Sequence, residues 1–117
     1  MKRVIIESPY AGDITDNVKY ARKCLLDSLR RGEAPLASHL LYTQPNVLSD
    51  IDGPERDMGI NAGLAWTKHA DVVAVYADHG ISDGMQKGIQ QAIAHKISVE
   101  FRSLMAVVEV PVDKETL

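Results

Sequence analysis

Residues 70–76 narrow the choice of fold more than any other part of this sequence. They read Ala-Asp-Val-Val-Ala-Val-Tyr, an almost continuous run of small and β-branched apolar residues. The run lacks the apolar and polar alternation of a strand that has one face in water. A strand of this kind is buried on both faces, as in a parallel sheet that helices cover on both sides. The run therefore predicts an α/β protein.

Further strands and helices are expected on either side of this run. The expected strands span residues 4–6, 36–41 and 97–101, with residues 105–110 as a candidate fifth. The expected helices span residues 17–31, residues 54–69, and a segment that starts after Ser82 and runs through Ile93. Strands and helices thus alternate along the chain, which predicts a Rossmann-like three-layer sandwich with a four- or five-stranded, mostly parallel sheet. We expect residues 1–117 to form one domain.

Composition excludes several classes of function. The 117 residues hold 13 Lys and Arg against 16 Asp and Glu, so the net charge of −3 does not favour binding to a nucleic acid polymer. A single cysteine rules out a disulfide framework and a cysteine zinc site. The four histidines do not have the spacing of a metal site, so we expect neither metal nor cofactor. No apolar run suggests a membrane span or a signal peptide, and we expect a cytoplasmic protein.

Three polar segments follow strands of the expected sheet, namely residues 7–13, 38–43 and 77–84. Ligands of such folds bind outside the carboxyl ends of the strands, so these segments should form the site. Ser82 and Gly84 open a helix, where free backbone N–H groups favour an anion such as a phosphate. Arg56 is a second candidate for binding a phosphate. The candidate ligand-binding residues are Ser8, Tyr10, Gly12, Ser38, His39, His79, Ser82, Gly84, Gly88 and Arg56.

The familiar motifs of nucleotide-binding and hydrolytic enzymes are missing from this sequence. It contains neither a Walker A loop nor a Gly-x-Gly-x-x-Gly fingerprint. It also lacks the Gly-x-Ser-x-Gly elbow of serine hydrolases. The function must therefore be sought in the three polar segments themselves.

Four stretches, in this order and spacing, resemble the nucleoside 2-deoxyribosyltransferase superfamily, which includes the 2′-deoxynucleoside 5′-phosphate N-hydrolases. Residues 4–12 resemble its opening strand and sugar-binding loop, and residues 36–39 its second strand end. Residues 65–73 resemble the helix and strand that precede the catalytic loop. Residues 82–92 are similar to the start of the catalytic helix. The chain looks most like a small, uncharacterised phage and bacterial branch of this group.

The resemblance implies a reaction in which a Glu carboxylate attacks the anomeric carbon of a nucleoside, displaces the base and passes the sugar to water or another base. An Asp on the preceding helix assists. The matching positions in this sequence are Gly88 for the Glu and Gly63 for the Asp. The Arg that holds a phosphate in the hydrolase branch falls at Tyr10. The family reaction therefore cannot run unaltered at these positions.

These departures leave three hypotheses open. The chemistry has moved to another acid, for which Glu7 is the best placed and Asp78 and Glu100 are the next, so that the protein still cleaves or exchanges an N-glycosidic bond. Alternatively, it binds a nucleoside or nucleotide without cutting it, as a sensing or sequestering protein. In the third hypothesis it is an assembly subunit with a vestigial pocket. The resemblance also implies a homodimer or a higher homo-oligomer.

Overall fold

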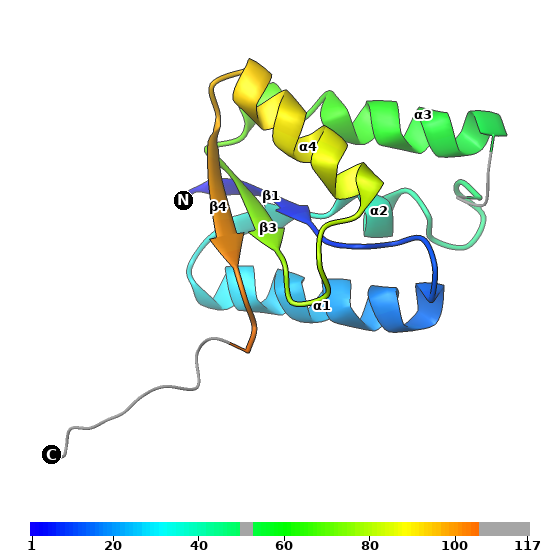
Figure 1. Ribbon diagram of the computed structural model, residues 1–117, viewed down its shortest axis with the longest axis horizontal. Coiled ribbons are helices and arrows are strands. Elements are labelled where there is room, and N and C mark those ends of the chain that lie inside the picture. Colours follow the sequence, from blue (N-terminus) through cyan, green and yellow to red (C-terminus); the bar gives the residue numbers. More distant parts are fainter. Residues whose placement is uncertain (50–52, 106–117) are drawn as a thin grey trace, which may run out of the picture.

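The computed structural model describes residues 1–49 and 53–105. Its helices and strands alternate along the chain (Figure 1). In chain order they are β1 (Arg3–Glu7), α1 (Ile14–Arg30), β2 (Ala34–Leu36), α2 (Ser38–Leu41), α3 (Gly53–Leu64), the 3-10 helix η1 (Thr67–His69), β3 (Val72–Tyr76), α4 (Asp83–Ala94) and β4 (Ser98–Arg102). The candidate fifth strand at residues 105–110 lies outside the described residues, apart from Met105.

The four strands form one parallel sheet in the order β2-β1-β3-β4. Ile5 of β1 lies opposite Val73 of β3 in the centre of the sheet. Val73 in turn lies opposite Val99 of the edge strand β4. The chain moves outward from β1 to β2 and then returns to place β3 on the other side of β1. Ligands of open parallel sheets bind at such a reversal, beyond the carboxyl ends of the strands.

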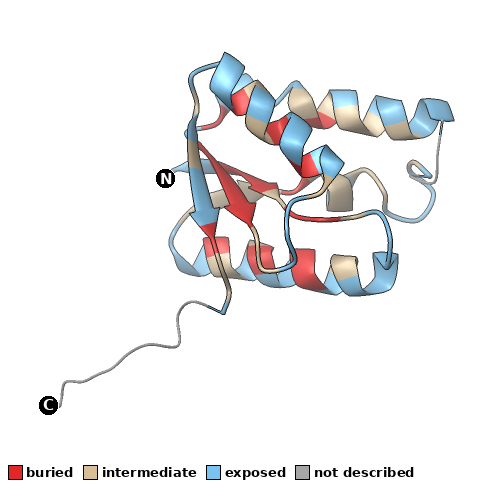
Figure 2. Cartoon of the chain, viewed as in Figure 1, coloured by how far each residue is buried: buried red, intermediate tan, exposed pale blue. Residues whose placement is uncertain are grey.

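Helices cover both faces of the sheet, with α1 on one side and α3 and α4 on the other (Figure 1). Alternate residues of β1 pack against the helices on opposite faces of the sheet, because neighbouring side chains of a strand point to opposite faces. Val4 and Ile6 pack with Cys24 of α1, whereas Ile5 packs with Met85 of α4. All five residues of β3 are buried, as Figure 2 shows. The predicted α/β sandwich with a parallel sheet is therefore confirmed.

The second predicted strand, residues 36–41, is mostly wrong. Strand β2 ends at Leu36, which pairs with Ile5, and the chain then turns into the short helix α2. Two backbone bonds close this turn, from the Leu41 N–H to the Ala37 carbonyl at 3.0 Å and from the Tyr42 N–H to the Ser38 carbonyl at 2.9 Å. The apolar run is compatible with either structure, and the helical turn places its side chains over the end of β1.

Two helix boundaries also differ from those expected. Helix α1 starts at Ile14 rather than at residue 17, because the Asp13 carboxylate accepts a hydrogen bond from the Asp16 N–H at 3.2 Å and caps the helix. The exposed first turn carries no apolar periodicity that would reveal it. Helix α3, which corresponds to the second expected helix, ends at Leu64 and not near His69. His69 instead closes the separate turn η1. No helix in the described ranges is long and apolar enough to cross a membrane.

Candidate active site

A cavity of about 290 Å³ lies at the carboxyl end of β1, beneath α2, α3 and the start of α4. Its walls come from the loop that follows β1, from α2, from one face of α3 and from the first turn of α4. The sequence-predicted residues that line it are Glu7, Ser8, Tyr10, Ser38, His39, Arg56, Ser82 and Gly84. The cavity thus brings together side chains that are far apart in the sequence, from the loop after β1 to the start of α4.

The carboxyl group of Glu7 lies directly against Gly88 of α4. A Cβ atom built on Gly88 would come within 2.2 Å of Glu7 Oε2 and 2.4 Å of Glu7 Cδ. A side chain at position 88 and the present position of the Glu7 carboxyl therefore exclude one another. Gly88 itself does not line the cavity, but its missing side chain makes the space in which Glu7 sits.

Glu7 is protonated at neutral pH in this environment. Loss of hydration raises the pKa of its carboxyl group to about 8. No side chain in the described ranges forms an ion pair with it that would favour the charged form. A carboxyl group that keeps its proton near pH 7 and faces a cavity is suited to proton transfer.

Gly63 of α3 has the same relation to Ser38. A Cβ atom built on Gly63 would lie 2.3 Å from Ser38 Oγ and 2.9 Å from Ser38 Cβ. The hydroxymethyl group of Ser38 therefore fills the place that a side chain at position 63 would need. The resemblance aligns both glycines with carboxylates of the family. Each thus has a polar side chain in the space next to it, Glu7 beside Gly88 and Ser38 beside Gly63.

Ser8 and His39 form a hydrogen-bonded pair on the cavity wall. Ser8 Oγ lies 2.6 Å from His39 Nε2, and the Ser8 residue is only 5% exposed. Loss of hydration lowers the pKa of His39 to about 4, so its imidazole is neutral at pH 7. In the tautomer with the proton on Nδ1, the Ser8 hydroxyl donates to Nε2.

The first turn of α4 closes one side of the cavity. Ser82 caps this helix as predicted, because its Oγ accepts a hydrogen bond from the Met85 N–H at 3.3 Å. Asp83, Gly84 and Met85 line the cavity beside it. Arg56 faces the same space from α3 and brings a positive charge to it. The cavity therefore combines one protonated acid, a serine–imidazole pair and a cation.

Asp78 and His79 do not reach this cavity, although both follow β3. The Asp78 carboxylate accepts hydrogen bonds from the Tyr20 hydroxyl at 2.7 Å, from the Leu104 N–H at 2.9 Å and from Ser103 Oγ. The ring of His79 stacks on Tyr20, with ring centroids 4.3 Å apart. Tyr20 of α1 therefore holds both residues on the other face of the sheet, and these bonds lower the pKa of Asp78.

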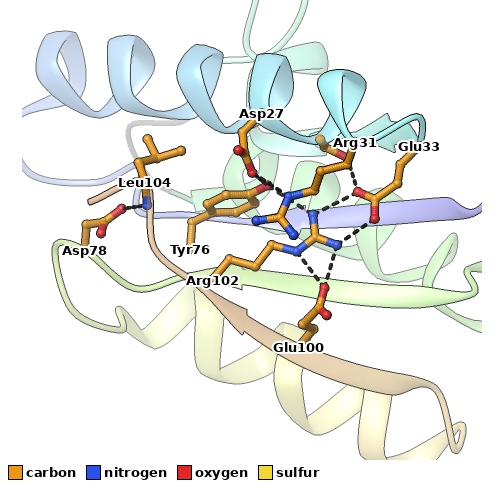
Figure 3. A network of polar contacts seen from close by, with 9 residues as sticks. Asp27, Arg31, Glu33, Tyr76, Asp78, Glu100, Arg102 and Leu104 are labelled. Carbon is orange, nitrogen blue, oxygen red and sulfur yellow. Dashed lines mark hydrogen bonds and ion pairs between the residues drawn. The ribbon is translucent and has the colours of Figure 1, made fainter. Parts of the chain in front are cut away.

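A polar network beside Asp78 joins the carboxyl ends of β3 and β4 to α1 (Figure 3). The Arg102 guanidinium donates to Glu33 Oε2 at 2.8 Å and to the Tyr76 hydroxyl at 3.1 Å. Glu100 pairs with the same guanidinium, 2.6 Å from Arg102 Nη2. Tyr76 donates in turn to Asp27 of α1 at 2.7 Å. These charges pair with one another, which gives them a structural role.

Gly12 lies in the loop before α1 and does not line the cavity. Its backbone φ of +98° is one that residues with a side chain rarely adopt, so the glycine is required by the turn. Asn17 holds this loop by donating its side-chain amide to the carbonyls of Tyr10 and Ala11, each at 2.9 Å. Gly12 thereby helps to place Tyr10 at the cavity.

Several lining residues were not anticipated. Gly59, Ile60, Gly63 and Leu64 line the cavity together with the predicted Arg56 and form one face of α3. They recur every three or four residues, so helical spacing around Arg56 could have identified this face. The other unanticipated residues are Ile5, Ala11, Tyr42, Thr43, Asp83 and Met85. Most of these belong to the three segments that the sequence places at this edge of the sheet.

Solved structures with the same fold include two 2-deoxyribosyltransferases. One, from the psychrotolerant bacterium Bacillus psychrosaccharolyticus, aligns with a TM-score of 0.67 and 14% identity over 95% of this chain and 77% of its own. The other, from Leishmania mexicana, has a TM-score of 0.60 and 13% identity over 88% of this chain and 65% of its own.

A CMP N-glycosidase from Clostridium botulinum also aligns, with a TM-score of 0.50 and 14% identity over 87% of this chain and 71% of its own. These likenesses show the fold that the sequence resemblance implied.

Comparison with curated protein sequences gives no match. A model of a protein family, described as a domain of unknown function (DUF7768), matches residues 2–102. The chain therefore belongs to the DUF7768 family, and its fold is that of the 2-deoxyribosyltransferases.

Proposed function

We propose that this protein binds a nucleoside or nucleotide in the cavity at the end of β1 and cleaves its N-glycosidic bond, with the Glu7 carboxyl as the reacting acid. The contact between Glu7 and Gly88 carries this proposal. It puts a carboxyl group at the helix position where the resembled enzymes have their Glu. The fold that this chain shares with two 2-deoxyribosyltransferases and a CMP N-glycosidase supports the class of substrate.

The character of the cavity suits such a ligand. Its volume of about 290 Å³ lies at the lower end of the range for small-molecule sites. Tyr10 and Tyr42 offer aromatic surfaces for a base or a sugar ring. Arg56 and the N-terminal turn of α4 favour an anionic group, which supports a 5′-phosphate on the ligand.

Binding without cleavage is the second candidate, and the contact between Gly63 and Ser38 favours it. The position of the assisting Asp in the resembled enzymes is filled here by a hydroxyl group, which has no charge to stabilise a sugar cation. Within the described ranges, Glu7 and Asp83 are the only carboxylic acids that line the cavity. A protein with this arrangement would sense or sequester a nucleotide.

Release of free base separates the two candidates. The protein is incubated with a panel of ribo- and 2′-deoxyribonucleosides and their 5′-monophosphates, and free base is measured by chromatography. Cleavage predicts release by the wild type, its loss in Glu7→Gln, and unchanged release by Asp57→Asn, which removes an exposed carboxylate of α3. Release that persists in Glu7→Gln would contradict the assigned role of this residue.

The single tryptophan gives an independent measure of binding. The Trp66 indole N–H donates to the Tyr42 hydroxyl at 3.0 Å, and Tyr42 lines the cavity. Trp66 is 50% exposed, so its fluorescence should respond when a ligand moves Tyr42. A saturable change without base release from any compound would refute cleavage and support the second candidate. A matched Tyr42→Phe variant, which loses the bond to Trp66, should reduce the response.

A further inference from the structure

We propose that the N-glycosidic bond is cut in one displacement by water, with Ser8 and His39 taking the proton of the water and Glu7 giving its proton to the departing base. This inference rests on the proposed cleavage and goes beyond it. A Glu that attacks the sugar forms a covalent intermediate and retains the anomeric configuration. Displacement by water instead inverts that configuration and forms no intermediate on the protein.

The Ser8–His39 pair has the geometry of a general base, which takes a proton from the attacking water. A neutral imidazole 2.6 Å from a serine hydroxyl can accept its proton, as in sites where histidine activates a hydroxyl group. Both residues line the cavity, so a water bound there can reach the Ser8 oxygen. The other ionisable groups that line the cavity are Glu7, Tyr10, Tyr42, Arg56 and Asp83. None of these has a hydrogen bond or ion pair to His39 within the described part of the chain.

Glu7 approaches the cavity from another side than this pair. Its carboxyl rests on Gly88 of α4, whereas the neighbouring Ser8 turns toward His39 of α2. A carboxyl group that carries a proton is a poor nucleophile but a good donor to a leaving nitrogen. An acid and a base that approach a sugar from different sides are what inversion requires.

The step balances with groups that the cavity holds and one water molecule. The water oxygen forms a bond to the anomeric carbon as the bond from that carbon to the base nitrogen breaks. The electron pair stays on the base nitrogen, which takes the proton from Glu7. The water gives a proton to Ser8 Oγ while the Ser8 hydroxyl proton passes to His39 Nε2. Transfer of that proton from His39 to Glu7 through solvent restores both groups.

The configuration of the product tests this inference directly. Wild-type protein is given a β-nucleoside or nucleotide from which it releases base, in buffer containing methanol as an alternative acceptor. The methyl glycoside, which cannot change its configuration afterwards, is then examined by NMR. The α-anomer supports displacement by water or methanol in one step. The β-anomer overturns this inference and leaves the proposed cleavage intact, whereas no release from any substrate overturns both.

Mass spectrometry of the intact protein provides a second readout. A 2-deoxy-2-fluoro nucleoside, which slows breakdown of a glycosyl-enzyme, should leave the mass of the wild-type protein unchanged. A glycosyl adduct on Glu7 would refute the inference, because a covalent intermediate requires Glu7 as the nucleophile. The same protein sample must release base from the unmodified substrate, so that the proposed cleavage is tested separately.

Substitution of the proposed general base, Ser8 and His39, provides the third readout. His39→Gln and Ser8→Ala should each lower kcat by about 10²-fold with little change in KM. His95→Gln, which alters an exposed histidine after α4, is the matched control and should keep full activity. Wild-type kcat should decline as pH rises through about 8, where Glu7 loses its proton, and also as pH falls toward 4, where His39 gains one. Unchanged kcat in folded Ser8→Ala and His39→Gln would refute the assignment.

Discussion

Replacing Glu7 by Gln should make the folded protein less sensitive to alkali. The carboxyl group has a pKa of about 8 in the folded state and of 4.5 as an unperturbed group. Between these values the unfolded chain has released a proton that the folded protein still holds. Unfolding is therefore favoured as pH rises. The stability that Glu7 confers at low pH declines from pH 4.5 upward and is fully lost above pH 8.

The size of the effect follows from the shift in pKa. One pKa unit corresponds to about 1.4 kcal/mol, so a shift from 4.5 to about 8 amounts to about 5 kcal/mol. A Gln side chain has nearly the same shape and no ionisation, and it can occupy the same place against Gly88. We expect Glu7→Gln to match the wild type near pH 4 and to exceed its free energy of unfolding by about 5 kcal/mol at pH 9. This is a large part of the stability of an ordinary domain.

Urea unfolding followed by circular dichroism at several pH values between 4 and 9 measures this difference. His39 titrates in both proteins, so its contribution cancels when the two free energies are subtracted. Asp57→Asn, at an exposed position on α3, is the control for a change from carboxylate to amide. A constant difference between Glu7→Gln and the wild type from pH 4 to pH 9 would refute the reasoning. It would show that Glu7 ionises in the folded protein as it does in water.

Three further substitutions test other parts of the structure. Gly88→Ala should lower stability by about 1–3 kcal/mol and abolish base release, because its Cβ would displace the Glu7 carboxyl; thermal unfolding and the base-release assay check this. Arg102→Met should cost about 3–5 kcal/mol in urea unfolding, since it removes the ion-pair partner of Glu33, whose side chain is only 12% exposed. Relative to His39→Gln, the wild type should lose about 3 kcal/mol of unfolding free energy from pH 6.5 to pH 4, because unfolding lets His39 take up a proton. Glu7 contributes equally to both proteins, so its opposite pH dependence cancels in this difference; parallel pH profiles of the two proteins would contradict the expectation.

The fold could be predicted because its main signal is local. The apolar run that became β3 admits few alternatives, and the strand and helix that follow it have clear boundaries at Ser82 and residue 97. The segment at residues 36–41 could not be resolved in this way. An apolar run of that length satisfies a strand or a helical turn equally well, and its pairing with β1 ends after Leu36. Only the tertiary arrangement decides between the two.

The position of the cavity could also be predicted, but its lining residues only in part. Parallel topology brings the ends of β1 and β2 to one edge, which is why the sequence singles out Glu7, Ser8 and His39. It could not show that Asp78 turns to the opposite face, because that choice depends on its bond to Tyr20. Nor could it show the contact of Glu7 with α4, which depends on the distance between a strand and a helix.

That contact constrains how a protein of this design can evolve. An acid on strand β1 and an acid on helix α4 compete for one volume, so a Glu introduced at Gly88 alone would collide with Glu7. Removing Glu7 first would leave an intermediate without either acid. Under the proposed function the two positions are therefore epistatic, and a lineage would move its reacting acid from helix to strand only through paired changes or through an inactive ancestor. The double variant Glu7→Gly with Gly88→Glu would recreate the other solution in this chain.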